Sequence, residues 1–522
     1  MDTVRSLVER AAAGRPHATY ALATESPGRT IDFRGLAASC RRIAALLEAY
    51  GVAPGETVSL VMPNGLATLR LLLGAMWAGR CVNPVNLLAQ EEQMRYVLEH
   101  SDCRLVVAAP QWEERVRSML AGIERPDGRA VRLLVVDADA ERLPGEDGGL
   151  DATEGADAAA ATAAPDVAAP APAALALLMY TSGTTGRPKG VMLTQANLAA
   201  NAQAIAREHA LGPDDRVLGV LPLYHINAFA VTMLAPLASM GSVAMAPRFS
   251  AARFWAQAID ARCTWINVVP TIVSFLLEGE APPAAALARL RLCRSASAAL
   301  PPEHLRAFES KFGIGVIETM GLTETVAPSF SNPLEPSQRK VGAVGRASGC
   351  EARVVDAALQ PLPDGQTGEL VIRGPNVMTG YYKNPEATAA AFTPDRWLRT
   401  GDLGHRDGDG FFFVSGRIKE LIIKGGENIA PREIDEVLLR HPAVLDAAAV
   451  GIPDRHYGQE ILACVVLREG AACSEQALRE FCAPLLGRYK TPKLFRFVAE
   501  LPRGPSGKVQ RLKLAEGFAA GQ

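Results

Sequence analysis

The sequence predicts an α/β protein with a large N-terminal domain of α/β subdomains, a small β-subdomain within it, and a small C-terminal α+β domain. Its 522 residues exceed what one hydrophobic core usually supports, which indicates several domains or subdomains. Strand and helix patterns alternate along the first 140 residues, which is typical of a mainly parallel sheet covered by helices. A second compact α/β pattern occupies the last hundred residues.

The periodicity of apolar residues predicts the first elements. Residues 33–49 have helical spacing, residues 57–62 are typical of a strand, residues 66–78 of a helix and residues 104–109 of a strand. From about residue 143 to residue 173 the composition narrows to Ala, Asp, Gly, Pro and Glu. Such a composition predicts a disordered insertion without chemistry of its own.

The middle of the chain continues the α/β alternation to about residue 345. Residues 174–179 are an apolar run that predicts a strand. Residues 217–246 are almost free of charge, but they contain proline, histidine and asparagine. They therefore predict a buried helix and strand beside a pocket and argue against a membrane span. The glycine-rich segment of about 345–413 predicts the β-subdomain.

The C-terminal pattern begins after residue 417, which gives expected domains of 1–417 and 418–522. We expect helices at residues 432–439 and 475–485. Strands are expected at residues 447–450, 461–467 and 494–498.

Composition and charge argue against several classes of function. The formal net charge of −2 gives no general attraction to nucleic acid or to an anionic membrane. The nine cysteines are scattered without a Cys-x-x-Cys pair, which argues against a disulfide framework and a structural zinc site. The N-terminus carries charges and no apolar signal segment, so a cytoplasmic location is expected.

The most informative motif is the segment 180–190, Tyr-Thr-Ser-Gly-Thr-Thr-Gly-Arg-Pro-Lys-Gly, which directly follows an apolar run. Its glycines allow backbone N–H groups to approach phosphate oxygens, and its hydroxyl groups can donate hydrogen bonds or hold Mg²⁺. Its lysine offsets phosphate charge. No Gly-Lys-Ser/Thr closes the segment, so it is not a Walker motif. The segment predicts a polyphosphate-binding loop rather than an ordinary glycine-rich turn.

Three further motifs follow in the chain. The segment 318–324, Glu-Thr-Met-Gly-Leu-Thr-Glu, offers a carboxylate suited to Mg²⁺ and a hydroxyl group suited to a phosphate. Asp402 stands on a Thr-Gly-Asp turn, where its two oxygens can accept both hydroxyl groups of a ribose, and Arg417 follows one strand later. Lys508 lies in a basic, glycine-containing loop near the C-terminus, where it can bridge reacting anions.

These four motifs, in this order, resemble those of the adenylate-forming superfamily, which includes acyl-CoA synthetases, the adenylation domains of peptide synthetases and firefly-type luciferases. The resemblance covers essentially the whole chain and is greatest to AMP-forming acyl-CoA synthetases. It implies that a carboxylate attacks the α-phosphate of ATP to give acyl-AMP and pyrophosphate, and that CoA then displaces AMP. It also implies a mobile C-terminal domain that rotates between the two steps.

The resemblance further implies roles for individual residues. Thr184 and Glu324 are the expected Mg²⁺ ligands, and both are expected to be catalytic together with Lys508 and His225. Met320 stands where most members have an aromatic ring that stacks on adenine. The expected ATP or AMP contacts are Thr181, Ser182, Gly183, Thr184, Thr185, Gly186, Lys189, Met320, Gly321, Thr323, Asp402, Arg417 and Lys508.

The same resemblance implies a hinge and a CoA channel. The hinge is expected at Lys419. Gly425 and Gly426 are expected to border the pantetheine arm of CoA, because residues without side chains leave room for a narrow tunnel.

The acyl pocket gives the least specific signal. Its polar residues, in positions where glycine or alanine is usual, indicate a polar or short acid. A second positive charge would favour a dicarboxylate, and Arg294 or Arg248 could supply one, but the sequence places neither in the pocket. We expect a small or medium organic acid, with an oxalate-like or malonate-like dicarboxylate as the alternative. The expected pocket residues are His225, Asn227, Ser297 and Ala298.

Three other functions share part of this pattern. Loading of a carrier-protein phosphopantetheine is the main alternative, although the Gly-Gly pair and the hinge motif favour free CoA. A luciferase-type oxygenase shares the adenylation step. A non-catalytic nucleotide-binding module would lack at least one charged site residue, yet all are present: Lys189, Glu324, Asp402, Arg417 and Lys508. The expected partners are the carboxylic acid and the CoA thiol, and a homodimer is left open.

Overall fold

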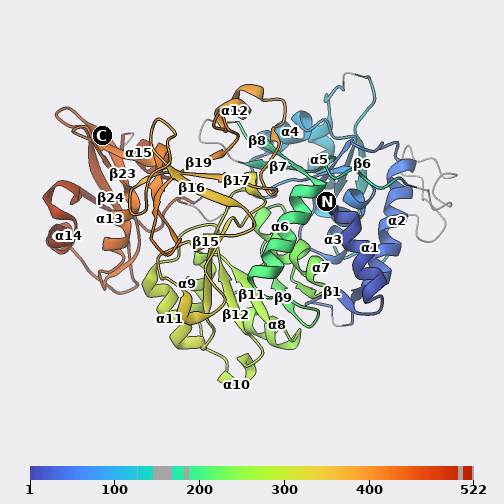
Figure 1. Ribbon diagram of the computed structural model, residues 1–522, viewed down its shortest axis with the longest axis horizontal. Helices are drawn as coiled ribbons and strands as arrows, with labels where there is room; N and C mark the ends of the chain where they lie inside the picture. The colour runs from blue at the N-terminus through green and yellow to red at the C-terminus, as the bar shows by residue number, and fades with distance from the viewer. Residues whose placement is uncertain (27, 126, 145–166, 182–186, 504–508, 520–522) are drawn as a thin grey trace.

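Two large β-sheets form the body of the N-terminal part of the protein, and two smaller sheets follow toward the C-terminus (Figure 1). The structure is a computed structural model that describes residues 1–26, 28–125, 127–144, 167–181, 187–503 and 509–519. Most of the expected insertion, residues 182–186 of the phosphate loop and Lys508 lie outside the described residues.

The first large sheet has nine strands in the order β15-β14-β13-β12-β11-β9-β10-β1-β2. The six strands from β13 to β1 in this order are parallel, as the alternating sequence pattern predicts. The strands are β1 (Thr19–Ala23), β2 (Thr30–Asp32), β9 (Arg216–Gly219), β10 (Ser242–Met245), β11 (Trp265–Val268), β12 (Leu292–Ser295), β13 (Val316–Met320), β14 (Phe330–Ser331) and β15 (Arg346–Ala347).

The second large sheet has seven strands in the order β18-β8-β7-β4-β3-β5-β6. All five residues of β3 are buried, which is typical of a parallel strand covered on both faces. The strands are β3 (Thr57–Val61), β4 (Cys81–Pro84), β5 (Leu105–Ala108), β6 (Arg132–Val135), β7 (Leu175–Thr181), β8 (Lys189–Thr194) and β18 (Gly380–Tyr381).

Helices connect the two sheets into one core. Helix α3 (Leu66–Trp77) contacts both β4 and β1, and α6 (Gln195–Glu208) contacts β7, β8 and the π-helix η3 (Ala228–Leu234). Residues of these helices and of both sheets form a single hydrophobic cluster. The same cluster includes α1 (Val4–Gly14), α2 (Phe33–Ala49) and α7 (Ala235–Ser239).

Local sequence explains where two of these helices begin. The Asp32 carboxylate accepts the Gly35 N–H at 2.6 Å and caps α2, and the apolar residues of α2 then follow one helical face. Thr194 caps α6 by accepting the Asn197 N–H, while the Asn197 side chain accepts the Thr194 N–H. Residue 194 also ends β8, so this capping box fixes the turn from strand to helix.

Further helices pack beside the sheets. Helices α4 (Glu91–His100) and α5 (Glu113–Leu120) share a hydrophobic cluster with residues of β3 and β5. A 3₁₀ turn, η1 (Pro110–Trp112), precedes α5. Helices α8 (Phe254–Asp260), α9 (Pro270–Glu278), α10 (Ala284–Leu287) and α11 (Pro302–Phe312) accompany the nine-stranded sheet, and the ring centroids of Trp255 in α8 and Phe312 in α11 lie 4.7 Å apart.

The third sheet is antiparallel, with the order β16-β17-β19-β20. It occupies most of the segment in which a β-subdomain is expected, while β15 and β18 of that segment join the two large sheets. Its strands are β16 (Glu351–Val355), β17 (Gly368–Arg373), β19 (Leu398–Arg406) and β20 (Phe412–Arg417), and α12 (Pro385–Ala390) lies between β18 and β19 in the chain.

The C-terminal part has its own sheet, with the path β22-β21-β24-β23 and with β25 paired to β24. Two hydrophobic clusters belong to it, one including α13 and α14 and the other including α15. The elements are β21 (Ile422–Lys424), β22 (Glu427–Ile429), α13 (Pro431–Leu438), β23 (Val444–Asp454), β24 (Gly458–Leu467), α14 (Glu475–Lys490), β25 (Leu494–Phe497) and α15 (Arg511–Ala519).

The expected fold class is confirmed: the protein is mixed α/β, with a large N-terminal domain and a smaller C-terminal domain at one end of the molecule (Figure 1). Among the described residues, none of the helices combines the length and the apolarity that a membrane crossing needs.

Candidate active site

The carboxyl ends of neighbouring parallel strands bring several predicted site residues to one sheet edge. The loop after β9 carries His225, the loop after β12 carries Ser297 and Ala298, and Met320 is the last residue of β13. These strands lie in the order β13-β12-β11-β9. Ligands of open α/β sheets bind at such an edge, which makes it the candidate site.

The phosphate loop joins the paired ends of β7 and β8. Thr181 ends β7, Lys189 begins β8, and the two residues stand opposite each other in the antiparallel register. The predicted contacts Ser182, Gly183, Thr184, Thr185 and Gly186 lie outside the described residues. The structure therefore describes the two ends of the loop and not its interior.

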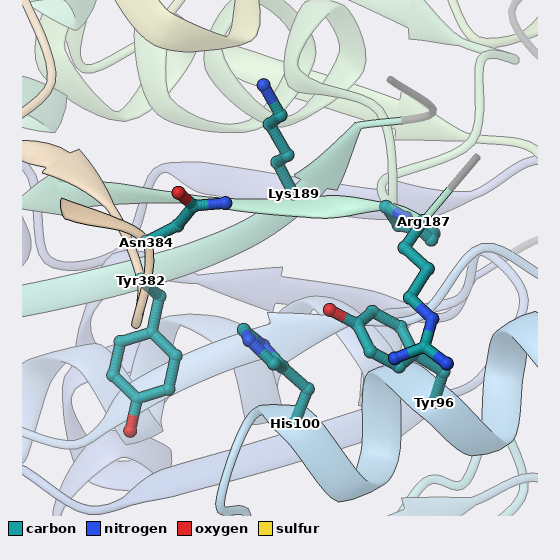
Figure 2. A pocket seen from close by; sticks show the side chains of 7 residues that line it. Tyr96, His100, Arg187, Lys189, Tyr382 and Asn384 are labelled. Carbon is teal, nitrogen blue, oxygen red and sulfur yellow. The ribbon is translucent and has the colours of Figure 1, made fainter. Parts of the chain in front are cut away.

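A cavity of about 290 Å³ lies beside Lys189, and Figure 2 shows the side chains that line it. His100 Nδ1 lies 2.8 Å from the Tyr180 hydroxyl oxygen, next to the start of the phosphate loop. Burial, and to a lesser degree Lys383, lowers the pKa of His100, which keeps the ring neutral. In Figure 2, Lys189 extends away from His100 and Tyr382, so its ammonium group belongs to a different side of β8.

The ammonium group of Lys189 lies beside Tyr381, which in turn contacts Glu324. Lys189 Nζ is 5.1 Å from the ring centroid of Tyr381, and the Tyr381 hydroxyl donates to Glu324 Oε1 at 2.9 Å. Burial raises the pKa of Tyr381 and the Glu324 carboxylate raises it further, so the hydroxyl stays protonated and donates. The sequence did not point to Tyr381, although the Gly380-Tyr381 pair that forms β18 was available as a signal.

Thr323 and Glu324 stand on a single 3₁₀ turn, η4 (Thr323–Thr325), that begins shortly after β13. A Cβ atom at Gly321 would lie 2.7 Å from the Cα atoms of both Ala327 and Pro328, so only glycine allows the chain to fold back this closely. Met320 is half-buried at the end of the strand.

Two buried asparagines hold this turn in place. Asn201 of α6 donates to the Val326 carbonyl oxygen at 2.7 Å, and Asn376 donates to the Thr325 carbonyl oxygen at 3.0 Å. Neither asparagine was a candidate from sequence, because a polar residue within a helix or loop is usually solvated, and only the fold shows that both are buried.

Asp402 and Arg417 form an ion pair across two neighbouring strands. They are paired in the register of β19 and β20, and Arg417 Nε donates to Asp402 Oδ1 at 2.6 Å. Burial opposes the charge of Arg417, but Asp402, Glu420 and Glu324 together raise its pKa above the ordinary value. Asp402 is buried, and each carboxylate oxygen can still accept a further hydrogen bond.

The expected acyl-pocket residues lie in two contacting loops. Asn227 is buried at the start of η3, and its Nδ2 donates to Ser297 Oγ at 3.3 Å. Ser297 is half-exposed and has a φ of +75°, a strained conformation for a residue with a side chain. Ala298 is half-exposed beside it, and His225 is half-exposed with its ring 4.8 Å from that of Tyr224.

The structure distinguishes between Arg294 and Arg248, either of which could supply a second positive charge to the acyl pocket on the basis of sequence. Arg248 is exposed at the surface. Arg294 lies on β12, has no exposed surface and donates from Nη1 to the Oδ1 atoms of Asn227 and Asn267, each at 2.7 Å. Arg294 therefore belongs to the same polar cluster as Asn227 and Ser297. Asn267, on the neighbouring strand β11, was not a candidate from sequence.

The predicted hinge lies between the third and fourth sheets. Lys419 is exposed on η6 (Ile418–Glu420), the single 3₁₀ turn that links β20 to β21. Gly425 and Gly426 form the two-residue turn between β21 and β22, with φ of +54° and +88°. These positive φ angles favour glycine at both positions, whatever further role the pair has.

Arg511, which follows the loop that carries Lys508, is held by several polar contacts. Lys508 itself lies outside the described residues. Arg511 begins α15 and donates to the Ala449 carbonyl oxygen at 2.8 Å and to Glu420 Oε2 at 3.2 Å, and it pairs with buried Asp435. The start of α15 is thereby tied to the C-terminal sheet and to η6.

Comparison with known proteins gives matches along almost the whole chain. Residues 8–382 match the protein family described as AMP-binding enzyme, and residues 433–508 match the family described as AMP-binding enzyme C-terminal domain. A sulfoacetate–CoA ligase of Cupriavidus necator is 58% identical over 516 residues, which are 98% of this chain and 97% of that protein. An oxalate–CoA ligase of Arabidopsis thaliana is 36% identical over 482 residues, which are 92% and 91% of the two chains.

Solved structures match over the same length. ATP-bound MatB from Rhodopseudomonas palustris has a TM-score of 0.88 at 31% sequence identity, with 99% of each chain covered. The o-succinylbenzoate CoA synthetase of Bacillus subtilis, in complex with its acyl-adenylate intermediate, has a TM-score of 0.83 at 28% identity, with 98% of each chain covered. Both sheets, the β-subdomain and the C-terminal domain therefore have counterparts in these structures.

Proposed function

Because this chain belongs to the AMP-binding enzyme family and is an AMP-forming acid:CoA ligase, we propose that its acid substrate is a short organic acid with a second anionic group, as in sulfoacetate or oxalate. The observation that carries the proposal is the polar lining of the expected acyl pocket, in which buried Asn227 donates to Ser297. An apolar acyl chain would remove water from these groups without replacing its hydrogen bonds. The names of the two similar ligases support the same class of acid.

In the first half-reaction, a carboxylate oxygen attacks the α-phosphorus of ATP, the bond to the bridging oxygen breaks, and pyrophosphate leaves. Two anions must approach each other, so the residues act by positioning and by neutralising charge. We assign Thr323 to the α-phosphate and Lys508 to the reacting oxygens. The residues assigned to the β- and γ-phosphates are Thr181, Ser182, Gly183, Thr184, Thr185, Gly186 and Lys189.

We assign the nucleoside to the opposite wall of the site. Asp402 accepts the ribose hydroxyl groups while Arg417 holds one edge of its carboxylate, at an Nε–Oδ1 distance of 2.6 Å. Met320 and Gly321 border the adenine, where the half-buried thioether packs on the purine face.

Glu324 fits a magnesium site. Tyr381 donates to Oε1 and fixes the carboxylate, and no described residue donates to Oε2. Mg²⁺ in nucleotide sites usually binds one or two carboxylates together with substrate phosphates. We assign Glu324 and Thr184 to this ion, which when bound neutralises charge on the phosphates.

In the second half-reaction, the CoA sulfur attacks the carbonyl carbon of acyl-AMP, the bond from that carbon to the phosphate oxygen breaks, AMP leaves and the thiol proton passes to solvent. We propose that the C-terminal domain rotates about Lys419 before this step, and that Gly425 and Gly426 then border the pantetheine arm. His225 borders the carboxylate and the thiol path in this assignment.

The proposal extends to assembly and location. We assign the protein to the cytoplasm, because all nine cysteines are free and most are buried, which suits a reducing compartment. Whether the protein forms a homodimer is left open by the sequence, and light scattering of the purified protein measures its assembly directly.

A panel of acids in a pyrophosphate-release assay, with and without CoA, tests the proposed substrate class. We expect the kcat/KM for sulfoacetate or oxalate to exceed that for acetate, propionate and hexanoate by about tenfold or more, because a polar site rejects analogues that leave its groups unpaired. An enzyme that prefers hexanoate or propionate over both dianions contradicts the proposal.

A further inference from the structure

Arg294 is a buried cation without a counter-ion. It has no exposed surface, and no carboxylate of the described residues lies within 4.0 Å of it. Its Nη1 donates to Asn227 and Asn267, but its Nε and Nη2 have no hydrogen-bond partner among the described residues. Nε and Nη2 are adjacent donors on one edge of the guanidinium group, so an entire edge is unused.

Arg80, which is also fully buried, is an example of an arginine with a purely structural role. Arg80 also has no exposed surface, but its Nε and Nη2 both donate to the Val52 carbonyl oxygen and its Nη1 donates to that of Ala78. Glu48 lies 3.8 Å away. Arg80 is satisfied by the protein itself, whereas Arg294 is not.

Fold stability does not explain Arg294. Burying a charge without a partner costs several kcal/mol, and an apolar residue on a central strand such as β12 would avoid that cost. Burial lowers the pKa of Arg294 to about 9, which leaves the group mostly charged at neutral pH. A buried residue that lowers the stability of the fold in this way is typical of a ligand-binding site.

Hydrogen bonds connect the guanidinium group of Arg294 to the candidate acyl pocket. Asn227 links the two, because its Oδ1 accepts from Arg294 while its Nδ2 donates to half-exposed Ser297. Ser297 follows Arg294 by three residues, past the carboxyl end of β12. A continuous polar path therefore runs from the rim of the site at Ser297 to the buried guanidinium group.

We propose that Arg294 binds the second anionic group of the substrate, a sulfonate or carboxylate, through Nε and Nη2, with Asn227 and Asn267 orienting the guanidinium group. Two parallel N–H donors match two oxygens of either anion. Fixing that end of a short acid leaves its reacting carboxylate at the sheet edge, toward the nucleotide. This inference rests on the proposed substrate class and names the residue that selects it.

The test compares kcat/KM for sulfoacetate with that for acetate in wild type, Arg294→Met and Arg294→Lys. In Arg294→Met we expect about a 100-fold loss for sulfoacetate and less than about a threefold change for acetate, because only sulfoacetate engages the buried charge. Arg294→Lys keeps the charge without the paired donors, so we expect an intermediate loss. Arg80→Met is the matched control, a buried arginine outside the site, and we expect the ratio of the two kcat/KM values to stay at the wild-type value.

Thermal unfolding separates binding from a structural role. We expect sulfoacetate to raise the melting temperature of wild type and not that of Arg294→Met. Equal losses for both acids in Arg294→Met, or no loss for either, overturn the inference. If Arg294→Met does not fold, the ratio in Arg294→Lys decides, and an unchanged ratio overturns the inference. A wild type without preference for dianions contradicts the proposed substrate class instead, so the two failures are distinct.

Discussion

Glu318 is a buried carboxyl group close to the candidate site, two residues before Met320 on β13. One of its oxygens accepts the Leu300 N–H at 3.2 Å, and the other has no hydrogen-bond partner among the described residues. Burial raises its pKa from 4.5 to about 7, with Arg432 of α13 acting in the opposite direction. The folded protein therefore holds a proton on Glu318 at pH values where the unfolded chain has lost it.

This difference makes stability depend on pH. Between about pH 4.5 and pH 7 the folded state binds more protons at Glu318 than the unfolded state does, so this residue lowers the free energy of unfolding as pH rises. Glu318→Gln is neutral at every pH and keeps an acceptor for Leu300. We expect it to be up to about 3 kcal/mol more stable than wild type at pH 8 and similar to wild type at pH 4.5.

Denaturant unfolding at pH 4.5, 6 and 8 measures the difference. Glu303→Gln, which changes an exposed carboxylate on α11, is the control and is expected to differ little from wild type at all three pH values. A difference between Glu318→Gln and wild type that does not grow with pH contradicts the assignment.

At the scale of elements, the site depends on contacts between segments that are far apart in the chain. The turn η4 carries Glu324, the short strand β18 carries Tyr381, and β8 carries Lys189, and β18 pairs directly with β8. Helix α6 adds Asn201, which donates to carbonyl oxygens of the chain that leaves η4. Tyr381 contacts no substrate in our assignment. It orients Glu324, the residue that we assign to the metal ion.

Tyr381→Phe tests that contact. A hydrogen bond to a charged group contributes about 1.5–3 kcal/mol, so losing the hydroxyl that holds Glu324 should lower kcat/KM for acyl-AMP formation by about tenfold or more. Raising the Mg²⁺ concentration should recover part of the loss, because the displaced carboxylate binds the ion less well.

Tyr382→Phe is the matched control for this prediction. Its hydroxyl donates to Asp102 at 2.8 Å and not to Glu324. We expect its adenylation rate to stay within about threefold of wild type, because the lost hydrogen bond does not involve Glu324. Equal losses in the two variants indicate a structural effect of either tyrosine and not a specific role of Tyr381.

The elements with the strongest periodicity are predictable from sequence. The helix predicted at residues 33–49 has the bounds of α2, because a cap and one apolar face define both ends. The strand predicted at residues 447–450 is the middle of the longer β23, since its flanks contain poor strand formers (Asp446, Gly451 and Pro453) that pairing with β24 holds in the strand. The family, the α/β class and the adenylating activity are confirmed, because they rest on motifs that follow one another along the chain.

Contacts that depend on strand register are not predictable in this way. The π-helix η3 has the apolar residues of an ordinary buried helix, and only its hydrogen bonds distinguish it. The choice between Arg294 and Arg248 likewise required the pairing of β12 with β11, which sets Arg294 opposite Asn267. A single sequence contains no direct record of such pairing.

For the whole molecule, the important feature is the small number of side-chain hydrogen bonds found, among the described residues, between the C-terminal domain and the rest. Arg432 of α13 donates to the Val414 carbonyl oxygen of β20 at 2.6 Å, whereas Arg511 contacts Glu420 on η6, the first turn after the expected domain boundary. Most remaining contacts of Arg511 are to its own domain. An interface of this kind suits a domain that changes orientation between two half-reactions.

Lys508→Ala tests whether this lysine of the C-terminal domain acts in the first half-reaction and not in the second. We expect acyl-AMP formation to fall by about 100-fold or more, because a charge that stabilises the reacting oxygens is lost. Transfer of the acyl group from supplied acyl-AMP to CoA should remain within about threefold of wild type, since a rotated domain no longer needs Lys508 at the site. Lys513→Ala, an exposed lysine on α15, is the control. Survival of both half-reactions in Lys508→Ala shows that the assignment is wrong.

The position of η6 has a practical consequence for protein engineering. Arg417 is the last residue of β20 and is held by Asp402 on the neighbouring strand, whereas the turn that leads to the C-terminal domain begins at the next residue. A chimera joined immediately after Arg417 would keep the whole β19–β20 ribose pair of this protein and take every later residue from a relative. Such hybrids would combine the acid and ribose contacts of this protein with the lysine loop and the glycine pair of a relative, so the two sets of contacts could be varied independently.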